Sequence, residues 1–246
     1  MLRTCFALSL VVSYFAVEAR AQSTGPDAEE IVRRYVAAHG GMERWREVQT
    51  LRLHGKLELG YEVEVPFVQE LKRPDKTRFE FVFRGETAVQ AFDGSRGWKY
   101  RPYAGYESPE SVVGEELESA RRDADFDGPL FDFAAKGNEV ELVGLGKAEG
   151  REVYELKLTL ASGAVQHVFL DSDSFTEVKV TRERDVRGAT MHVSTFKFDH
   201  RWIDGLLLPF HFETQTDGSS ERRVMTIDRI EVDVPIEDAR FQEPVG

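Results

Sequence analysis

The sequence predicts a mainly β protein of the α+β class, built on a single curved antiparallel sheet of about ten or eleven strands. Two helical segments, one N-terminal and one mid-chain, are expected to cover the concave side of this sheet. Apolar residues follow a helical period in those two segments, alternate with polar residues elsewhere, and are separated by Asp-Gly turns. No Pro/Gly/Ser-rich linker or fixed-period repeat divides the chain, so we expect one domain.

The first 21 residues have the pattern of a secretory signal peptide. A short basic start precedes an apolar run that ends at Ala19-Arg20-Ala21, a small-residue cleavage site. The run is shorter than the roughly 20 residues that a membrane-spanning helix needs. We therefore expect a cleaved signal peptide over residues 1–21, a single exported domain over residues 22–246, and a periplasmic location with no transmembrane segment in the mature chain.

Charge and cysteine content narrow the possible partners. The 246 residues include 32 Lys+Arg and 44 Asp+Glu, a net charge of −12. Removing the signal segment, which carries +1, leaves −13. Such a charge repels polyphosphates and anionic membrane surfaces, so nucleic acid is not an expected partner. Cys5 is the only cysteine and lies in the signal segment, which excludes disulfides and zinc–thiolate sites in the mature chain.

The N-terminal helix is predicted from three features, which are a capping residue at its start, an apolar face along its length and two glycines at its end. Asp27 stands three residues before Glu30, as in a capping box. Ile31, Val32 and Tyr35 then fall on one helical face. Gly40-Gly41 ends this helix, and a short second turn passes through Trp45 and Val48.

After this the period changes from 3.6 to 2, which indicates half-buried strands. Residues 107–136 interrupt the alternation: Ser108-Pro109-Glu110 is a typical helix start, and Val113, Leu117, Ala120 and Ala124 follow at roughly helical spacing. The alternating runs are residues 51–59, 63–71, 78–84, 89–92, 98–100, 140–142, 154–160, 165–170, 175–180, 191–198, 206–212 and 224–232.

Familiar catalytic and metal-binding patterns are not matched. Gly144–Gly150 nearly fits a dinucleotide-binding loop, but the spacing is wrong and a strand pattern follows, so a hairpin turn is expected. Asp123–Gly128 begins like a calcium loop, but Ala134 stands where that loop needs a bidentate acid. No two histidines have a metal-ligating spacing. We therefore expect no catalytic residue, no metal and no cofactor, although paired catalytic carboxylates remain open.

One feature that does point to a site is the number of apolar aromatic side chains, with 17 Phe against 7 Tyr. These aromatic side chains could form an ordinary closed core or line a hydrophobic cavity between the sheet and its helices. Such a cavity would hold acyl chains by burial, at about 0.8 kcal/mol per CH₂. The candidate lining residues are Phe67, Phe79, Phe81, Phe83, Trp98, Tyr100, Leu156, Leu158, Phe169, Phe196, Phe198, Phe210 and Phe212.

Several short stretches, taken in order, resemble the LolA/LolB-like superfamily of outer-membrane lipoprotein-sorting proteins, in its longer and less characterised branch. The resemblance spans most of the mature chain. The stretches are the helix over 31–41 that ends in His-Gly-Gly, the hairpin over 89–94 with Gly97-Trp98, the segment 124–130, the runs 140–144 and 154–158, and the tail over 234–238 near Phe241.

This resemblance implies an unclosed half-barrel whose helices enclose a hydrophobic cavity. It implies a carrier that binds acyl chains of lipoproteins or another lipid and moves them across the periplasm toward the outer membrane, with transport partners at the inner and outer membranes. The best-known carriers use a basic residue at the cavity to regulate loading, for which we place no equivalent here. The membrane-anchored receptor of that system has a cysteine after its signal, and none stands there in this sequence, so a soluble carrier fits better. We expect this carrier to be a monomer.

Two other functions remain open. A non-carrying envelope-assembly module on the same fold would have a filled interior and an exposed apolar patch. An enzyme acting on lipid or glycan would have acidic or His side chains converging in a pocket with shifted pKa values.

Overall fold

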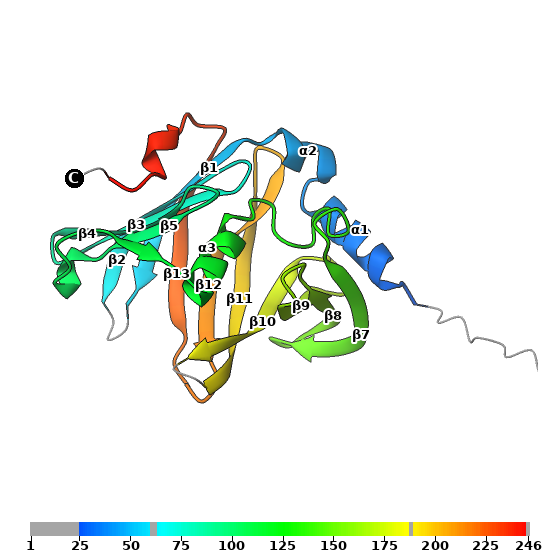
Figure 1. Ribbon diagram of the computed structural model, residues 1–246. Helices are drawn as coiled ribbons and strands as arrows, with labels where there is room; N and C mark the ends of the chain where they lie inside the picture. Colours follow the sequence, from blue (N-terminus) through cyan, green and yellow to red (C-terminus); the bar gives the residue numbers. More distant parts are fainter. Residues whose placement is uncertain (1–24, 60–62, 187–188, 245–246) are drawn as a thin grey trace, which may run out of the picture.

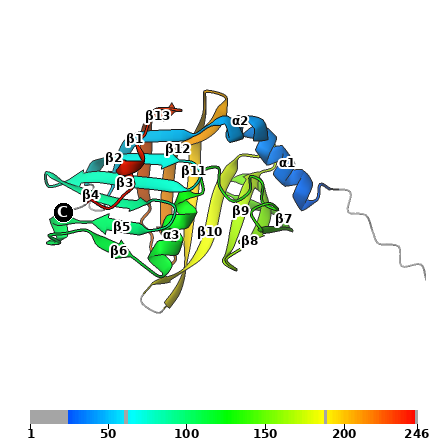
Figure 2. The same ribbon diagram turned by 45° about the horizontal axis from the view of Figure 1, so that its top comes forward.

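A computed structural model describes residues 25–59, 63–186 and 189–244 of the protein. The predicted signal peptide over residues 1–21 lies outside these ranges. The chain forms one antiparallel sheet that curves around helix α3 (Glu115–Ala124), as Figures 1 and 2 show. The prediction of a mainly β, unclosed antiparallel sheet is confirmed, but its strand count of ten or eleven is wrong, because the described sheet has thirteen strands.

The strands alternate with short turns along most of the chain, as the Asp-Gly signals predicted. Asp93-Gly94, Asp204-Gly205 and Asp217-Gly218 each fall between two consecutive paired strands. The strands are β1 Thr50–Glu58, β2 Glu64–Lys72, β3 Lys76–Phe83, β4 Glu86–Phe92, β5 Gly97–Tyr100, β6 Glu110–Val112, β7 Glu139–Ala148, β8 Arg151–Thr159, β9 Val165–Asp171, β10 Glu177–Val186, β11 Ala189–Ile203, β12 Leu206–Thr216 and β13 Arg223–Val232.

The first and last strands pair with each other at the middle of the sheet. The strand order is β6-β5-β4-β3-β2-β1-β13-β12-β11-β10-β9-β8-β7, so β6 and β7 are the two free edges. The segment that connects them, residues 113–138, carries α3 and runs across the concave side (Figure 2). The connection between the two edges therefore also covers the space that the sheet encloses.

Strand β6 lies where the sequence predicted the start of a helix. Glu110–Val112 pairs with β5, and α3 begins only at Glu115, after Gly114 with a φ of 60°. Gly97 explains why the edge can extend here: a Cβ at this position would lie 3.1 Å from the Cβ of Val112 and 3.2 Å from Leu117. The missing side chain lets both β6 and α3 approach β5, and that contact is not visible in the local pattern around Pro109.

The two N-terminal helices close one end of the concave side. Helix α1 (Ala28–Ala38) is capped by Asp27, whose carboxylate accepts from the Glu30 amide at 2.8 Å, and helix α2 (Met42–Glu47) buries Trp45. Gly40 lies between them with a φ of 105°, and a Cβ there would be 2.1 Å from the carbonyl oxygen of Gly205. The His-Gly-Gly motif thus lets the α1–α2 corner contact the β11–β12 hairpin directly.

Four groups of apolar residues cover the two faces of the described sheet, and three of them lie near the N-terminal helices, α3 and the C-terminal segment. The main core joins α1, α2 and the loop after α3 to β1, β8, β9, β12 and β13, and contains Ile31, Phe131, Leu156 and Ile230. A smaller cluster packs Phe92 of β4 against Ala120 and Ala124 of α3. On the opposite face, Trp98 packs with Val89 and Ala91 beneath the C-terminal segment. In the described residues, no helix is long and apolar enough to span a membrane.

Candidate functional site

Three adjoining hollows lie on the concave side, between the sheet and the segment that contains α3. Their volumes are about 490, 340 and 310 Å³, and we call them the first, second and third hollows. The first and second share Asp125, Glu177 and Lys197 in their walls. The second and third share Gln69 and Asp123. We refer to these three neighbouring hollows together as the cavity.

The sheet side of the second and third hollows is largely apolar. It is built from alternate residues of β1, β2 and β3 and continues onto β12 and β13. Strands β1 and β13 place Leu53 opposite Ile230 and Leu57 opposite Met225, one pair on each side of a register shift between His54 and Gly55. The apolar wall, as we call it, consists of Leu51, Leu53, Leu57, Leu71, Phe79, Leu208, Phe212, Met225 and Ile230.

Of the thirteen predicted lining residues, Phe79 and Phe212 border this cavity. Phe67 stacks on Phe79 with ring centres 5.2 Å apart and belongs to the main core. Leu156, Leu158 and Phe210 are also buried in that core, and Phe81 packs against its rim. Phe83 lies farther out, edge-on to Tyr103.

The remaining five lie on the opposite face of the sheet. Trp98 donates a hydrogen bond from Nε1 to the carbonyl oxygen of Phe241 at 2.8 Å and, with Tyr100, belongs to the cluster beneath the C-terminal segment. Phe169 packs with Ala148, Val153 and Val178, outside the main core. Phe196 lies next to Thr195 and Lys197, which face the cavity, so it faces away, beneath the guanidinium of Arg222. Phe198 lies opposite His211 in the strand register and faces the same way.

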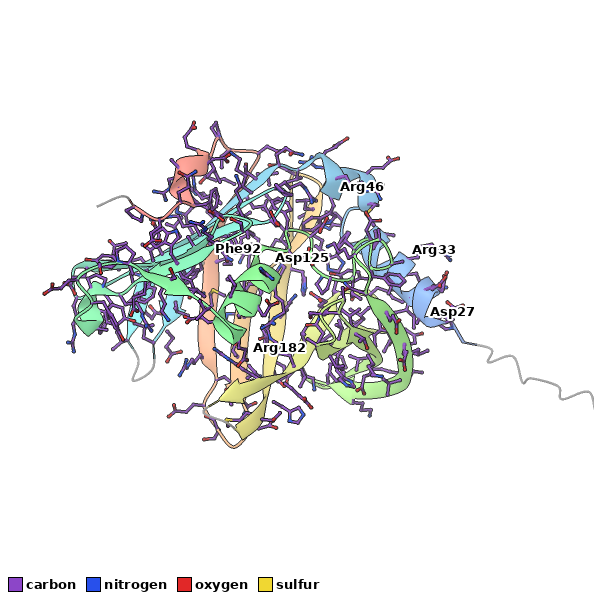
Figure 3. All side chains as sticks on the ribbon, viewed as in Figure 1. Asp27, Arg33, Arg46, Phe92, Asp125 and Arg182 are labelled. Carbon is purple, nitrogen blue, oxygen red and sulfur yellow. The ribbon has the colours of Figure 1, made fainter. Side chains whose placement is uncertain are left out.

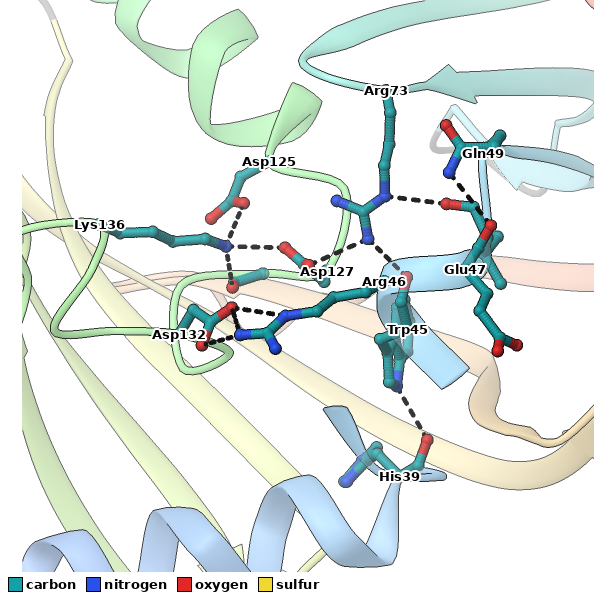
Figure 4. Close-up of polar contacts among 12 residues, drawn as sticks. His39, Trp45, Arg46, Glu47, Gln49, Arg73, Asp125, Asp127, Asp132 and Lys136 are labelled. Atoms are coloured by element: carbon teal, nitrogen blue, oxygen red, sulfur yellow. Dashed lines mark hydrogen bonds and ion pairs between the residues drawn. The ribbon is translucent and has the colours of Figure 1, made fainter. Parts of the chain in front are cut away.

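The loop after α3 is held in place by ion pairs that the sequence did not predict (Figure 4). Lys136 Nζ donates to Asp125 at 2.5 Å, to Asp127 at 2.7 Å and to the carbonyl of Gly128 at 2.7 Å. Arg73 donates to Asp127 at 3.1 Å and to the carbonyl of Trp45 at 2.7 Å. Two of the three acids that looked like the start of a calcium loop, Asp125 and Asp127, are therefore paired with cations from other parts of the fold.

These contacts set the charge states of the two acids. Burial raises the pKa of Asp125 and outweighs its contact with Lys136. Burial acts in the same direction on Asp127, but its contacts with Lys136 and Arg73 prevail and lower its pKa. Asp127 is thus held as a carboxylate, while Asp125 is protonated more readily.

A second ion pair joins Glu177 of β10 to Lys197 of β11, at the border between the first and second hollows. Burial would raise the pKa of Glu177, but Lys197 outweighs it and lowers that pKa. Two histidines lie beside the pair, with ring centres 6.3 Å apart. Burial is the main cause that lowers the pKa of His39, and burial and His39 lower that of His200 to about 4, so both rings are neutral near pH 7.

The first hollow has a different character, because its wall carries several cations. Arg121 and Arg122 of α3 stand opposite Arg182 of β10, which Figure 3 places below the helix. Asp123 borders the second and third hollows and is exposed, yet the surrounding protein raises its pKa through burial. A side chain that lies inside a water-filled hollow can be both accessible to solvent and surrounded by protein, which accounts for the exposure and for the raised pKa of Asp123. The cavity therefore has an apolar wall and a charged wall.

Sequence reasoning missed the charged wall for identifiable reasons. Lys197 stands between Phe196 and Phe198, and the alternating pattern alone does not tell which of the two sets faces inward. Glu177 faces the cavity through a register shift between Glu177 and Lys179, which leaves no trace in the sequence. Within the described ranges, no group of three His, Asp or Glu side chains is arranged to hold a metal ion.

Comparisons with known proteins show which solved structures have a similar fold. No protein-family model matches the sequence. No curated protein matches it either. Solved structures do match. A LolA superfamily protein from Nitrosomonas europaea aligns with a TM-score of 0.58 at 12% identity, over 89% of this chain and 99% of that one.

Two further structures agree. A DUF1329 family protein from Desulfovibrio piger aligns with a TM-score of 0.61 at 15% identity, over 87% of this chain and 97% of the other. A domain described as an outer membrane lipoprotein-sorting protein, from Vibrio parahaemolyticus, aligns with a TM-score of 0.56 at 14% identity, over 87% and 95%. The chain therefore has the fold of LolA superfamily proteins, and the resemblance expected from the sequence is confirmed at the level of the fold.

Proposed function

We propose that this protein is a periplasmic carrier that binds the acyl chains of lipoproteins or another lipid in the cavity beneath α3 and moves them toward the outer membrane. The observation that carries this proposal is the apolar wall, whose side chains border the second and third hollows. The shared fold with LolA superfamily proteins supports it. Export by a cleaved signal peptide is part of the proposal.

The energetics of the apolar wall suit an acyl chain. A methylene group that leaves water contributes about 0.8 kcal/mol, so ten methylenes along this wall would contribute about 8 kcal/mol before the cost of ordering the chain. Such binding requires few directional contacts. It therefore does not depend on a particular catalytic constellation.

The contacts of α3 suit a movable cover. The helix packs on Phe92 of the sheet through Leu117, Ala120 and Ala124, two of which are alanines with small contact surfaces. Glu116 of the helix also pairs with Lys99 of β5. The loop that follows is anchored by Lys136 and Arg73. We propose that cargo enters by displacement of α3 while this loop keeps its position.

Mass spectrometry of organic extracts from gently purified protein tests the proposal. We expect bound lipid in the parent protein and a large loss in Leu57→Trp, which places a bulky ring in the third hollow. Leu145→Trp is the matched control, because Leu145 is 61% exposed on β7, away from the cavity. An empty parent protein, or equal lipid in both variants, would contradict the carrier function.

A non-carrying interaction module is the second candidate, and one observation favours it. Leu142, Val143 and Leu145 are exposed on β7, one of the two edge strands of the described sheet. Exposed apolar side chains at a sheet edge are typical of a protein-binding surface. If the extract contains no lipid and Leu145→Asp abolishes capture of an envelope protein, this candidate replaces the carrier.

The enzyme alternative requires acids or histidines with shifted pKa values in a pocket, and Glu177, Asp125 and His200 meet that description. Lys197 forms an ion pair with Glu177, and Lys136 forms one with Asp125. A carboxylate that is held in an ion pair is better suited to a structural role than to that of a general base. The same extracts decide this point. Intact lipid is expected, whereas free fatty acid or cleaved headgroup that is absent from the Glu177→Gln variant would favour an enzyme.

A further inference from the structure

The first hollow has an excess of positive charge, although the protein as a whole is strongly acidic. Five cations line it against three acids, in a chain whose net charge is −12. The cations are Arg121, Arg122, Lys136, Arg182 and Lys197. Since like charges gathered in one hollow repel each other, this cluster needs a physical reason.

Three of the five cations have a protein partner. Lys136 contacts Asp125 and Asp127, Lys197 contacts Glu177, and Arg121 contacts Glu118 at 3.1 Å. These pairs hold the fold together and leave little net charge. They do not explain the excess.

Arg122 and Arg182 account for the excess. Among the described side chains, no carboxylate lies within 4.0 Å of either guanidinium. The Nε of Arg122 is buried without a hydrogen-bond partner in the described part of the chain. Burial and the neighbouring Arg122 and Arg184 lower the pKa of Arg182, against the opposing effect of Asp123. Asp123 therefore attracts Arg182 without contacting it. A partly buried guanidinium with no carboxylate in contact is costly unless a ligand supplies the missing charge.

We infer that the cargo is an anionic amphiphile, whose phosphate or carboxylate headgroup is held by Arg122 and Arg182 in the first hollow while its acyl chains lie on the apolar wall. This inference rests on the proposed carrier function and specifies its ligand. Guanidinium groups bind such oxyanions through paired hydrogen bonds, which suits two arginines on facing elements. The border residues Asp125, Glu177 and Lys197 connect the headgroup end to the second hollow.

Lipid extraction from vesicles tests the inference. Vesicles of dioleoylphosphatidylcholine, with or without an equal part of dioleoylphosphatidylglycerol, are mixed with the purified protein, and the lipid that remains with the protein after vesicle removal is quantified. The two lipids share their acyl chains and differ in headgroup charge. Because the protein is acidic, it is repelled by the anionic surface, and preferential extraction of the anionic lipid would have to come from the cavity.

We expect preferential extraction of phosphatidylglycerol and a loss of about tenfold for each of Arg122→Gln and Arg182→Gln, as for a charge-assisted hydrogen bond. Extraction of phosphatidylcholine should not change. The matched controls are the single variants Arg33→Gln and Arg229→Gln, each of which removes one positive charge from a side chain that is 76% or 61% exposed. The cavity variants should melt at or above the parent temperature, since they remove unpaired charges.

The outcomes separate the two proposals. Equal extraction of both lipids by the parent protein would overturn the anionic headgroup while supporting the carrier. Extraction of neither would overturn the carrier, and this inference with it. Binding of inorganic phosphate that depends on Arg122 and Arg182, without any lipid extraction, would show a site for a soluble anion and overturn the lipid as its source. If both arginine variants unfold, Arg182→Lys, which retains the charge, should retain the preference, and its loss there would overturn the inference.

Discussion

The strands β1 to β5 are covered on both faces, and the two covers differ in how they pack. On the convex face, the C-terminal segment buries Phe241 completely and accepts a hydrogen bond from Trp98. Glu70, also on that face, is 2% exposed and receives hydrogen bonds from Arg52 and Arg240, each at 2.9 Å. On the concave face, α3 rests on alanines and leaves hollows beside it.

This comparison separates a structural cover from a functional one. Side chains of the C-terminal segment interlock with those of the sheet, so its removal would expose apolar surface and leave buried charges unpaired. The concave cover holds charged residues such as Asp123 over open space, which contributes little to stability. Substitutions on the convex side should therefore affect the free energy of unfolding, and those on the concave side should affect ligand binding.

The largest expected effect comes from Phe241→Ala. The ring is fully buried beneath the convex cover, and a substitution of this type costs about 3–5 kcal/mol. Urea unfolding followed by circular dichroism measures the change. Val113→Ala, at a side chain that is 71% exposed, is the control and should change stability by less than about 0.5 kcal/mol. A cost below about 1 kcal/mol for Phe241→Ala would mean that the convex cover is not structural.

A pair of charge-neutralising variants sharpens the comparison further. Glu70→Gln on the convex face should cost about 2–3 kcal/mol, because it removes the charge of a buried carboxylate that pairs with two arginines. Arg52 loses its acid partner, while Arg240 keeps its contact with Glu80. Asp125→Asn on the concave face should cost less than about 1 kcal/mol, because Lys136 keeps its contact with Asp127. Equal costs in urea unfolding would show that the two covers do not differ in the way we describe.

The last effect depends on pH and concerns a histidine beside the cavity. His200 has its pKa lowered from the ordinary 6.5 to about 4, so the unfolded chain binds the extra proton first as the pH falls. The stability from this group is fully present above about pH 6.5 and is lost as the pH falls toward 4, by up to about 3 kcal/mol and less where water reaches the ring. His200→Asn should flatten the stability profile in this window, whereas the exposed His192→Asn should not. Parallel profiles for the parent and His200→Asn would contradict this assignment.

Much of the fold could be predicted from local pattern. The alternation of apolar and polar residues located most strands, Asp27 and Gly40-Gly41 bounded α1, and the Asp-Gly pairs marked turns, because each of these signals depends on neighbours in the sequence. Strand β6 was missed because Ser108-Pro109-Glu110 is a good local helix start, while the strand is stabilised by a distant partner, Gly97.

For the candidate site, the sequence predicted that an apolar space lies beside the sheet, but it did not identify most of the residues that line that space. The expectation of a space beside an apolar sheet face led to Phe79 and Phe212, but Trp98 and Phe196 have the same local pattern and face the other way. The face that a residue presents depends on register shifts and on which segment covers the sheet. The charged wall was not predictable at all, since Arg122 and Arg182 meet only because α3 crosses β10 in space.

The path of the chain from β6 to β7 has a mechanical consequence. Because the two free edges are joined by residues 113–138, this segment acts as a strap whose length limits how far the rims of the half-barrel can spread. Straightening α3 would lengthen the strap and widen the mouth without breaking a single strand pairing. Cutting it once would remove that limit while every strand stayed in place.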